Sequence, residues 1–468
     1  MIGVVVSRAD RASEHIGERL LAADWTARED EDRPDADGGG TYHRTSVAGE
    51  SFELRAFDDM HIHLDDPTPA FSERPDYLVF VSRHSGDTGP LLTCHFTGNF
   101  GDAEYGGSDR SFAPACPGVQ RALVAGFDEH APDGYGVAVE CTHHGPTELS
   151  VPSLFAELGS DDDQWDDPAG AAAVARAVLD LPERGATPAA GDPDDPRHLV
   201  GLGGGHYAPR FERVLRETAW GVGHVASDWQ LEELGHPGEH ADALAAAFDA
   251  SDARFALVEG ETDRPALERA LADLGYRVVS ETWVRAVDDR PLDLVSELEA
   301  DLRPVDEGLR FGAVRSEAYA VVDLPDDLLA AAHGVDPERA RAAVADRAVA
   351  FETRENGTQA VGRAAFPDTG TDGADGTGRT DAPDAAGTYD DLIDALAALL
   401  RETHDEVERR PDAVVARTAA FDPEKAATLG VPEGPAFGAL AGGESVEVNG
   451  ETVPPTAVES ERVEEFPV

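Results

Sequence analysis

Lysine is almost absent from this chain of 468 residues, in which Lys425 is the only one. Arginine supplies the remaining cations, and 38 basic residues face 93 acidic ones, for a formal net charge of -55. Self-repulsion on this scale destabilises a compact fold in dilute buffer, whereas molar salt shortens the Debye length to about 3 Å and screens it. The composition therefore indicates a halophile's protein. In low salt, such acidity would argue against a nucleic-acid partner.

Cysteine is also scarce. Cys94, Cys116 and Cys141 are odd in number and lack CxxC spacing, which excludes a disulfide framework and a zinc ribbon. No apolar stretch approaches the roughly 20 residues that cross a bilayer. The apolar start Met1–Val6 lacks the basic flank and cleavage site of a signal peptide. We therefore expect a soluble, cytoplasmic protein with no membrane partner, long enough for two or three domains.

Apolar runs of strand length alternate with amphipathic helical patterns as far as about residue 283. This alternation favours an α/β fold in which helices flank a mixed, mainly parallel sheet. A hairpin is expected over Thr41–Leu54. The other predicted strands are Ile2–Val6, Tyr77–Ser82, Leu91–His95, Gly136–Cys141, Ser153–Leu158, His198–Gly203, Gly221–Val225 and Phe255–Val258. The predicted helices are Ala9–Ala22, Ala169–Leu181, His240–Phe248 and Pro265–Leu274.

The alternation of apolar runs and helical patterns ends at about residue 283. Residues 1–283 are therefore predicted to form the core, and the rest an appended module. Residues 284–365 read as an acidic, helix-rich extension, with helices over Asp288–Arg303 and Leu328–Ala350. Residues 366–389 are rich in Gly, Asp and Thr and predict a disordered linker. Residues 390–468 predict a small α+β segment, with a helix over Asp390–Thr403 and a hairpin over Ser445–Thr452 that turns at Asn449-Gly450.

Four short histidine-bearing segments lie at the ends of apolar runs, namely Arg83–Gly86, Thr93–Asn99, Glu140–Glu148 and Gly201–Arg210. Neutral imidazole is the commonest protein ligand for zinc, and carboxylates can complete its coordination shell. Ligands of open α/β sheets bind beyond the carboxyl ends of the strands. The four segments therefore converge on one rim if their strands run the same way, and the pattern predicts an active site.

The third segment carries the strongest pattern. Pro146 keeps Gly145 out of helical geometry, so that a rigid loop can hold a histidine and Glu148 near one metal. Neighbouring side chains on extended backbone point to opposite sides, so we expect only His143 or His144 in a given metal shell. The other would bridge to a second metal or orient substrate. A histidine-rich surface turn is the alternative interpretation.

The fourth segment contains three glycines before His206, but it fits neither GxxxxGK[ST] nor GxGxxG, so a nucleotide-binding loop is not expected. Glycines there permit close backbone approach, with amides available to an oxyanion. A flexible turn is the alternative. Cys94 and Cys141 adjoin histidines, but no base is paired with either thiol by the sequence. His61 and His63 alternate as on one face of a strand, and a solvated edge strand explains them equally well.

Together these segments resemble the archaeal and plant type of D-aminoacyl-tRNA deacylase, a zinc-dependent family. The resemblance runs from Met1 to about Trp283 and rests on Phe80–Ser85, Thr97–Gly101, Tyr105–Gly107, Thr142–Pro152 and Gly203–Pro209. It implies two Zn²⁺ ions per chain and a fold like that of peptidyl-tRNA hydrolases and zinc carboxypeptidases. It also implies hydrolysis of the ester that joins a D-amino acid to the 3′ end of tRNA. Glycine, being achiral, would be released as well, from glycyl-tRNA(Ala). The chain departs from the family in its lysine poverty and in the tail after residue 283.

The implied mechanism is metal-assisted ester hydrolysis, with zinc lowering the pKa of water toward about 7. The predicted zinc ligands are His95, His143, His144, Glu148 and His206. Glu140 or Glu104 is expected as a further ligand or general base, and the amides around Gly204 and Gly205 as oxyanion donors. The residues expected to bind substrate are Arg83, His84, Asn99, Tyr207 and Arg210, whose two arginines suit tRNA phosphate.

Two other functions stay open at this stage. A zinc-dependent carboxypeptidase- or amidohydrolase-like enzyme would act on small peptides with the same ligands. A tRNA-binding protein with structural zinc would be no enzyme, but structural sites are usually closed by four ligands, frequently cysteine. The sequence indicates no obligate protein partner, and we expect a monomer.

Overall fold

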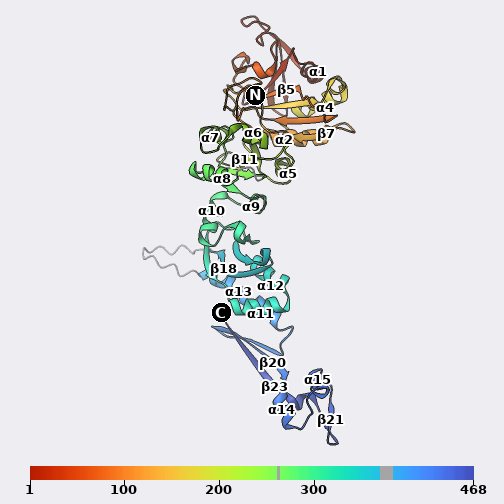
Figure 1. Ribbon diagram of the computed structural model, residues 1–468, viewed down its shortest axis with the longest axis vertical. Coiled ribbons are helices and arrows are strands. Elements are labelled where there is room, and N and C mark those ends of the chain that lie inside the picture. The colour runs from red at the N-terminus through yellow and green to blue at the C-terminus, as the bar shows by residue number, and fades with distance from the viewer. Residues whose placement is uncertain (261–263, 369–382) are drawn as a thin grey trace, which may run out of the picture. The chain divides into compact units, whose positions relative to one another are not determined.

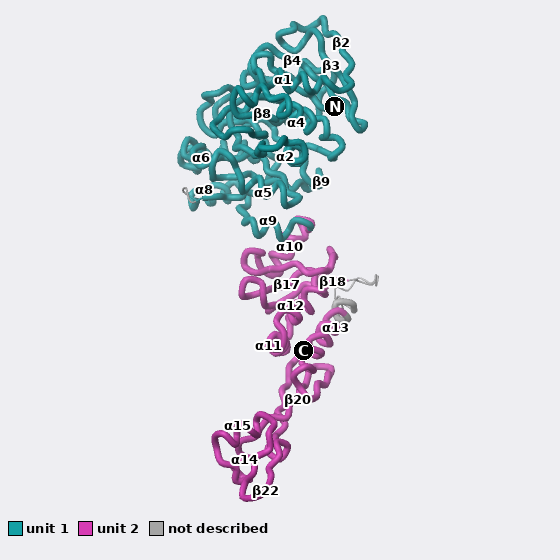
Figure 2. The backbone as a smooth tube through the Cα atoms, turned by 90° about the vertical axis from the view of Figure 1, so that its right-hand side faces the viewer, with its two compact units in different colours: residues 1–289 teal, residues 290–468 magenta. Residues whose placement is uncertain are grey.

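The computed structural model describes residues 1–260, 264–368 and 383–468. The chain forms two compact units, Met1–Asp289 and Arg290–Val468, coloured teal and magenta in Figure 2. Each unit is described by itself below. No helix within the described residues has the length and apolarity that a membrane span requires.

Unit 1 is built around a mixed sheet of eight strands in the order β2-β3-β4-β1-β5-β8-β6-β7 (Figure 1). Strands β4, β1, β5 and β8 run parallel, whereas β6 is antiparallel to β8 and parallel to β7. The strands are β1 (Ile2–Ser7), β2 (Thr26–Asp30), β3 (Gly40–Val47), β4 (Glu50–Phe57), β5 (Tyr77–Arg83), β6 (Leu91–His95), β7 (Gly136–Val139) and β8 (Ser153–Gly159). The prediction of a mixed sheet flanked by helices is confirmed.

One face of this sheet is covered by α1 (Arg11–Leu20), α2 (Pro117–His130) and α4 (Pro168–Leu179). Gly17 of α1 lies against Val6, and Gly170 of α4 lies so close to Leu158 that a Cβ would approach its Cδ1 to 2.6 Å. Side chains alternate along a strand, so the opposite face carries a different set. That set begins with an apolar floor that includes Val5, Leu78, Phe80 and Phe155.

A second sheet of unit 1 has four parallel strands in the order β12-β11-β13-β14. They are β11 (His198–Leu202), β12 (Gly221–Ala226), β13 (Phe255–Val258) and β14 (Arg277–Val279). The alternating helices are α5 (Pro209–Glu217), α6 (Asp228–Leu234), α7 (Ala241–Ala250), α8 (Arg264–Asp273) and α9 (Glu281–Ala286). Shorter elements are α3 (Asp162–Trp165), β9 (Gly191–Asp192) and β10 (Asp195–Pro196). The eight predicted strands and the hairpin around Gly49 are all present, and those strands' ends lie within two residues of the predicted ones.

Unit 2 contains an antiparallel sheet in the order β15-β17-β18-β16, a three-stranded sheet β19-β20-β23 and the hairpin β21-β22. Its strands are β15 (Leu309–Phe311), β16 (Tyr319–Asp323), β17 (Ala350–Arg354), β18 (Gln359–Pro367), β19 (Glu406–Arg409), β20 (Ala413–Phe421), β21 (Val446–Val448), β22 (Glu451–Val453) and β23 (Glu459–Pro467). Its helices are α10 (Leu292–Asp301), α11 (Asp326–Val335), α12 (Pro337–Ala345), α13 (Pro383–Leu400), α14 (Pro423–Thr428) and α15 (Pro435–Ala441).

Several predictions for this region need correction. The helix-rich extension also contains a four-stranded sheet, whose strands β15 and β16 are short and only partly buried. The predicted disordered linker 366–389 is too long, because Phe366 and Pro367 end β18 and Pro383–Tyr389 begin α13. Residues 369–382 of that linker lie outside the described residues. The hairpin at Asn449-Gly450 is confirmed.

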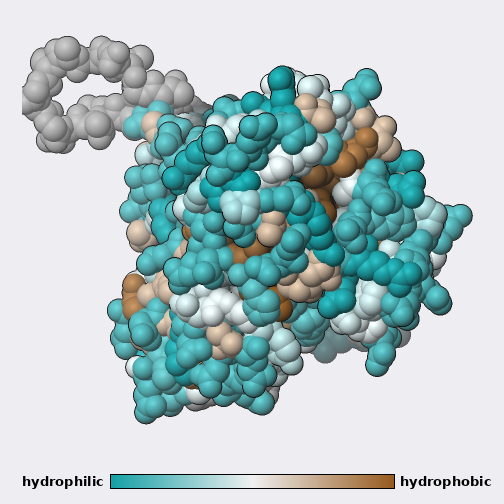
Figure 3. All heavy atoms as spheres, turned by 90° about the horizontal axis from the view of Figure 1, so that it is seen from above, coloured by the Kyte–Doolittle hydropathy of each residue, from teal (hydrophilic) through white to brown (hydrophobic). Residues whose placement is uncertain are grey.

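The His61–His63 pair does not lie on an edge strand. These residues form one turn of 3₁₀-helix, which leaves His61 buried and His63 exposed. Hydrophilic residues cover most of the face seen in Figure 3, as the excess of acidic side chains requires.

Candidate metal centre

The candidate centre lies on the face of the first sheet opposite to α1, α2 and α4. Glu157 of β8 is the central residue, paired in register with Ser82 of β5 on one side and with Thr93 of β6 on the other. His84 and His95 each follow two residues later, so their side chains point to the same face as Glu157. The sequence predicted that the four histidine-bearing segments meet at one edge of the sheet. That requires all their strands to run the same way, but β6 runs antiparallel to β8. The histidines meet over a sheet face instead.

Three histidines present one free ring nitrogen each. Nδ1 of His95 donates to the carbonyl of Phe96 at 3.0 Å, Nδ1 of His143 to Cys141 at 2.8 Å and Nδ1 of His144 to Gly145 at 2.7 Å. A carbonyl oxygen can only accept, so Nδ1 holds the proton of each neutral ring and Nε2 keeps its lone pair. Such bonds fix the tautomer and ring orientation of metal-ligating histidines.

The three rings form one cluster. Their centroids lie 4.1 to 4.8 Å apart, and one ligand nitrogen from each lies within 4.8 Å of the other two. His95 also stacks on Phe155 of the apolar floor at 5.2 Å. We expected only one of His143 and His144 in a given shell, but His144 has φ +45°. The alternation of extended backbone therefore does not apply, and both rings reach the same point.

Glu140, directly after β7, connects this cluster to the second sheet. The backbone forms a bridge between Glu140 and Tyr207, and the amide of Cys141 donates to the carbonyl of His206 at 2.8 Å. One carboxylate oxygen of Glu140 accepts from Nε2 of His206 at 2.8 Å, while the other lies 3.0 Å from Nδ1 of His84. His206, Cys141 and His143 form a second group with metal-ligand spacing.

Glu157 and His84 complete the buried part of the site. Glu157 accepts from the Ser82 hydroxyl at 2.6 Å and lies 3.4 Å from Nε2 of His95 and 3.6 Å from Nδ1 of His84. Nε2 of His84 in turn meets the hydroxyl of Tyr207 at 2.9 Å. Sequence reasoning missed Glu157. A charged residue within the otherwise buried run Ser153–Gly159 was the feature that could have revealed it.

The surroundings of the site histidines shift their pKa values in different directions, so the histidines differ in charge. Burial lowers the pKa of His143 well below its usual range, and repulsion from a protonated His95 or His144 lowers it further. Burial would lower the pKa of His95 too, but the Glu157 carboxylate raises it. Burial and then His95 lower the pKa of His144 to about 4. Burial alone would lower the pKa of His84, but hydrogen bonds to Glu140 and Glu157 raise it to about 11. His143 and His144 are therefore neutral ligand donors at neutral pH, and His84 is a cation between two carboxylates.

The residues fit a divalent metal such as zinc, which binds imidazole nitrogen, carboxylate oxygen and thiolate sulfur. Nε2 of His95 is buried 3.4 Å from the Glu157 carboxylate, and Oε1 of Glu140 is buried 3.0 Å from Nδ1 of His84. The histidine cluster therefore lies beside buried carboxylates, and together they supply ligands of the right kind.

An open cavity of about 240 Å³ adjoins the histidines. His143, His144 and His206 form part of its wall. Its other lining residues are Asn99, Phe100, Gly101, Asp102, Glu104, Tyr105, Trp229, Gln230 and Glu233. The buried cluster is thus reached from outside, as a site for reaction requires.

Among the other predicted residues, Asn99 and Glu104 line this cavity, although the Asn99 amide already donates to Gly106 and Ser108. Glu148 is exposed and belongs to none of the metal-type groups found among the described residues. Glu157 and Glu140 provide the carboxylates instead.

The structure also bears on the glycines predicted as oxyanion donors and on the arginines predicted to bind phosphate. The amide of Gly204 donates to Asp228 at 3.1 Å and is not available to an oxyanion, whereas Gly205 is exposed. Arg83 is exposed, with its guanidinium 5.3 Å from the Trp165 ring. Arg210 is bound to Glu281 and to the carbonyl of Val258.

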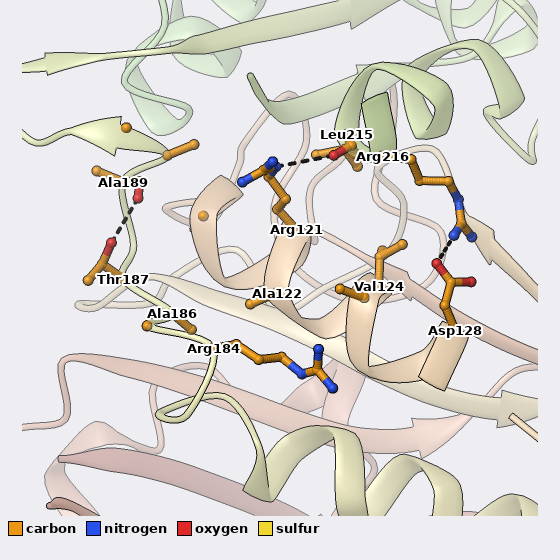
Figure 4. Close-up of a pocket in the computed structure, with 15 residues that line it drawn as sticks. Arg121, Ala122, Val124, Asp128, Arg184, Ala186, Thr187, Ala189, Leu215 and Arg216 are labelled. Atoms are coloured by element: carbon orange, nitrogen blue, oxygen red, sulfur yellow. Dashed lines mark hydrogen bonds and ion pairs between the residues drawn. The ribbon is translucent and has the colours of Figure 1, made fainter. Parts of the chain in front are cut away.

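A larger cavity of about 630 Å³ lies between α2, the loop 184–191 and the end of α5 (Figure 4). Arg184 pairs there with Glu129 at 2.6 Å, and Arg216 pairs with Asp128. Its lining residues include none of the clustered histidines or carboxylates. It is therefore separate from the candidate centre.

Fold and site together define a candidate hydrolase of mixed α/β architecture. The family model described as D-aminoacyl-tRNA deacylase matches residues 71–279, which include every residue of the cluster. The chain is 53% identical to a D-aminoacyl-tRNA deacylase of Halorubrum lacusprofundi, covering 100% of this chain and 97% of that one. It is 51% identical to one of Natronomonas pharaonis, with 100% of both chains covered. The chain belongs to the D-aminoacyl-tRNA deacylase family.

Among solved structures, the crystal structure of a conserved protein of unknown function matches with a TM-score of 0.51 and 27% identity. The match covers 62% of this chain and 97% of that one. The fold of this part of the chain therefore has an experimentally determined counterpart.

Proposed function

We propose that this chain hydrolyses the ester bond of D-aminoacyl-tRNA, releasing the D-amino acid and reusable tRNA, with the help of bound zinc. The observation that carries the proposal is the cluster of His95, His143 and His144, whose free Nε2 atoms converge beside an open cavity. Membership of the deacylase family supplies the substrate class.

His95, His143 and His144 would hold one zinc ion. Bound zinc supplies Lewis acidity, which polarises an ester carbonyl and lowers the pKa of water. A second ion, expected from the family, has two candidate groups. One is Cys141, His143 and His206, and the other is His84, Glu140 and Glu157.

The chain's own residues would then move the protons. Water adds to the ester carbonyl, the bond between the acyl carbon and the ribose oxygen breaks, and the ribose oxygen leaves with a proton. His206 lines the cavity and shares the proton on its Nε2 with Glu140 at 2.8 Å. This pair would take up the proton that water loses and deliver a proton to the ribose oxygen through His206. His84 and Glu157 hold Glu140 and His95 in position.

The lining of the cavity favours an aminoacyl ester over a peptide. Its charged residues besides histidine are the carboxylates Asp102, Glu104 and Glu233, and no arginine or lysine lines it among the described residues. Burial, with Glu104 and Asp102 nearby, raises the pKa of Glu233. A carboxypeptidase needs a cation for the terminal carboxylate of its substrate. An aminoacyl ester has no such carboxylate and presents an α-ammonium group, which carboxylates attract.

The remaining family expectations are part of the same proposal. Glycyl-tRNA(Ala) would also be a substrate because glycine has no side chain to test. Charged tRNA places the reaction in the cytoplasm. A likeness to peptidyl-tRNA hydrolases and zinc carboxypeptidases stays a prediction of the sequence, as does a tRNA contact by residues beyond 283.

The decisive experiment compares D-tyrosyl-tRNA, L-tyrosyl-tRNA and free D-tyrosine amide as substrates in molar KCl. We expect release of tyrosine from the D-charged tRNA, slow release from the L-charged tRNA and negligible hydrolysis of the amide. Amide hydrolysis as fast as that of D-tyrosyl-tRNA would favour the peptidase. Bound metal without hydrolysis of any D-aminoacyl-tRNA would favour a binding protein.

A further inference from the structure

Two exposed aromatic side chains flank the cavity beside the histidine cluster. Tyr105 is 67% exposed and Trp229 is 44% exposed, and both line this cavity. They are the two large hydrophobic side chains most accessible to solvent in the described part of unit 1. Isolated apolar residues on a surface need no explanation, but two exposed aromatic rings beside one cavity that adjoins the histidine cluster do.

The backbone of Tyr105 and the helix that carries Trp229 are both bonded to the loop that carries the histidines. On one side, Gly145 donates its amide to the carbonyl of Tyr105 at 3.1 Å. On the other side, the Gln230 side chain donates to the carbonyl of Thr142, directly beside Trp229 in α6. The two aromatics are therefore fixed on the two flanks of residues 142–145.

A second pair of bonds fixes α6 to the loop of His206. The amide of Asp228 donates to the carbonyl of Gly204 at 2.8 Å, and the Asp228 carboxylate accepts from the Gly204 amide at 3.1 Å. Trp229 follows Asp228 in the chain, so its position is tied to both histidine-bearing loops. With the backbone anchored, only the few side-chain torsions of each aromatic residue lose freedom when a ligand stacks on its ring.

We infer that Tyr105 and Trp229 form a stacking platform for a purine base, the adenine of the nucleotide that carries the ester. This inference rests on the proposed function. Every tRNA bears its amino acid on the ribose of a 3′-terminal adenosine, so the base lies close to the reacting bond. Aromatic side chains are the usual partners of unpaired bases in single-stranded nucleic acid.

Charge and salt favour stacking over phosphate contacts at this cavity. Asp102, Glu104 and Glu233 line it, and they would repel phosphate. In the molar salt that a net charge of -55 implies, phosphate contacts lose most of their affinity through the loss of counterion release. Stacking does not depend on ionic attraction, so an acidic enzyme in strong salt can still bind the neutral base.

The test uses two ester substrates that differ in the base. One is 3′-O-(D-tyrosyl)adenosine and the other is D-tyrosine ethyl ester, each assayed with the full chain in molar KCl. Trp229→Ala and Tyr105→Ala should each lower kcat/KM for the adenosine ester about 10-fold or more through KM. Neither substitution should change hydrolysis of the ethyl ester, which has no base to stack.

Ring-retaining variants and a remote control sharpen the test. Trp229→Phe and Tyr105→Phe should stay within about threefold of the wild type because a ring remains. Leu429→Ala removes another exposed apolar side chain, 47% exposed and in unit 2, and should have no effect. Equal losses on both esters would overturn the inference, because the rings would then contact the amino acid. Unchanged kinetics in both alanine variants would overturn it as well.

Equilibrium dialysis with adenosine separates this inference from the proposed function, since it needs no hydrolysis. We expect saturable binding to the wild type in molar KCl and about 10-fold weaker binding to Trp229→Ala. Absence of adenosine binding would overturn the platform even in an active deacylase. Adenosine binding without hydrolysis of D-tyrosyl-tRNA would uphold the platform and reject the proposed activity.

Discussion

Two buried histidines of unit 1 differ from those of the cluster. His198 and His224 each use both ring nitrogens in hydrogen bonds to the surrounding protein. His95, His143 and His144 use Nδ1 for a backbone carbonyl, and one ligand nitrogen of each lies within 4.8 Å of the other two. Metal binding would explain why three imidazoles gather at one point.

Substitution of Glu157 should lower the activity, whereas substitution of Glu148 should not. Glu157→Gln keeps the size of the side chain but removes the charge that faces His84 and His95. We expect kcat/KM for D-tyrosyl-tRNA to fall about 10- to 100-fold, as for residues that orient metal ligands. Glu148→Gln is the matched control, because Glu148 is exposed, and should keep wild-type rates. Full activity in Glu157→Gln would remove this residue from the site.

His61 makes stability depend on pH. It is buried against Phe80 and Phe155, and burial lowers its pKa to about 3. The unfolded chain binds the proton with a pKa of about 6.5, so neutral His61 stabilises the fold fully above that pH. This stability is lost as the pH falls from about 6.5 to about 3, by up to about 5 kcal/mol.

The measurement is urea unfolding of the wild type and His61→Gln at several pH values, in molar KCl with chelator. The glutamine variant stays neutral, so its free energy of unfolding should decline less below pH 6.5. Parallel curves for the two proteins would show that His61 does not titrate as inferred.

At the scale of elements, the loop of residues 142–148 decides the geometry of the site. Its place is fixed by close backbone packing, since a Cβ on Gly145 would lie 2.4 Å from the amide nitrogen of Gly107 and 2.7 Å from the carbonyl oxygen of Ile62. Backbone atoms at such distances cannot move aside cheaply. The adjacent histidines are therefore held by a position that only glycine can occupy.

Gly145→Ala should displace the loop, with loss of bound zinc and a fall in activity of at least about 10-fold. Gly205→Ala is the control, because the nearest atom to its added Cβ would be 3.7 Å away and its φ is not positive. Metal content and rates of D-tyrosyl-tRNA hydrolysis check both variants. A Gly145→Ala protein with full zinc and full rate would contradict the close packing described here.

The sequence predicts the elements better than their directions. Buried strands such as Tyr77–Arg83 and His198–Leu202 are continuous apolar runs, which burial on both faces requires. Half-exposed strands such as Thr26–Asp30 carry no such run and were not predicted. Nothing local encodes that β6 runs against β8, because pairing is set by contacts far apart in the chain. The predicted rim was therefore wrong.

The site residues also divide into those that a local sequence pattern indicates and those that depend on how the strands pair. His95, His143, His144, His206 and Glu140 were candidates from the sequence because each lies in a histidine-bearing segment at the end of an apolar run, and the structure brings them together. Glu157 stands out in sequence only as a charge within the run Ser153–Gly159, and its role becomes clear only when β8 is placed between β5 and β6. Glu148 was assigned from its nearness in sequence to His144, but its side chain points to solvent.

At the scale of the whole molecule, unit 1 contains every residue of the candidate centre. The cluster runs from His84 to His206, within Met1–Asp289. The solved relative matches 62% of this chain with 97% of its own, a share that corresponds in length to unit 1.

We expect residues 1–289 alone to bind zinc and to hydrolyse 3′-O-(D-tyrosyl)adenosine at the rate of the full chain in molar KCl. If unit 2 contacts tRNA, its removal should raise KM for D-tyrosyl-tRNA and leave the small substrate unaffected. Loss of zinc from the shortened, folded chain would show that unit 2 is needed to build the centre.

The central claim is that the imidazoles of His95, His143 and His144, from separate parts of unit 1, bind one metal ion. Anomalous X-ray diffraction at the zinc absorption edge, on crystals of the full chain grown with zinc, tests this directly. We predict a peak within coordination distance, about 2.0–2.1 Å, of Nε2 of His95, His143 and His144. Crystals that show no peak there, or that show zinc only at other residues, would contradict the account.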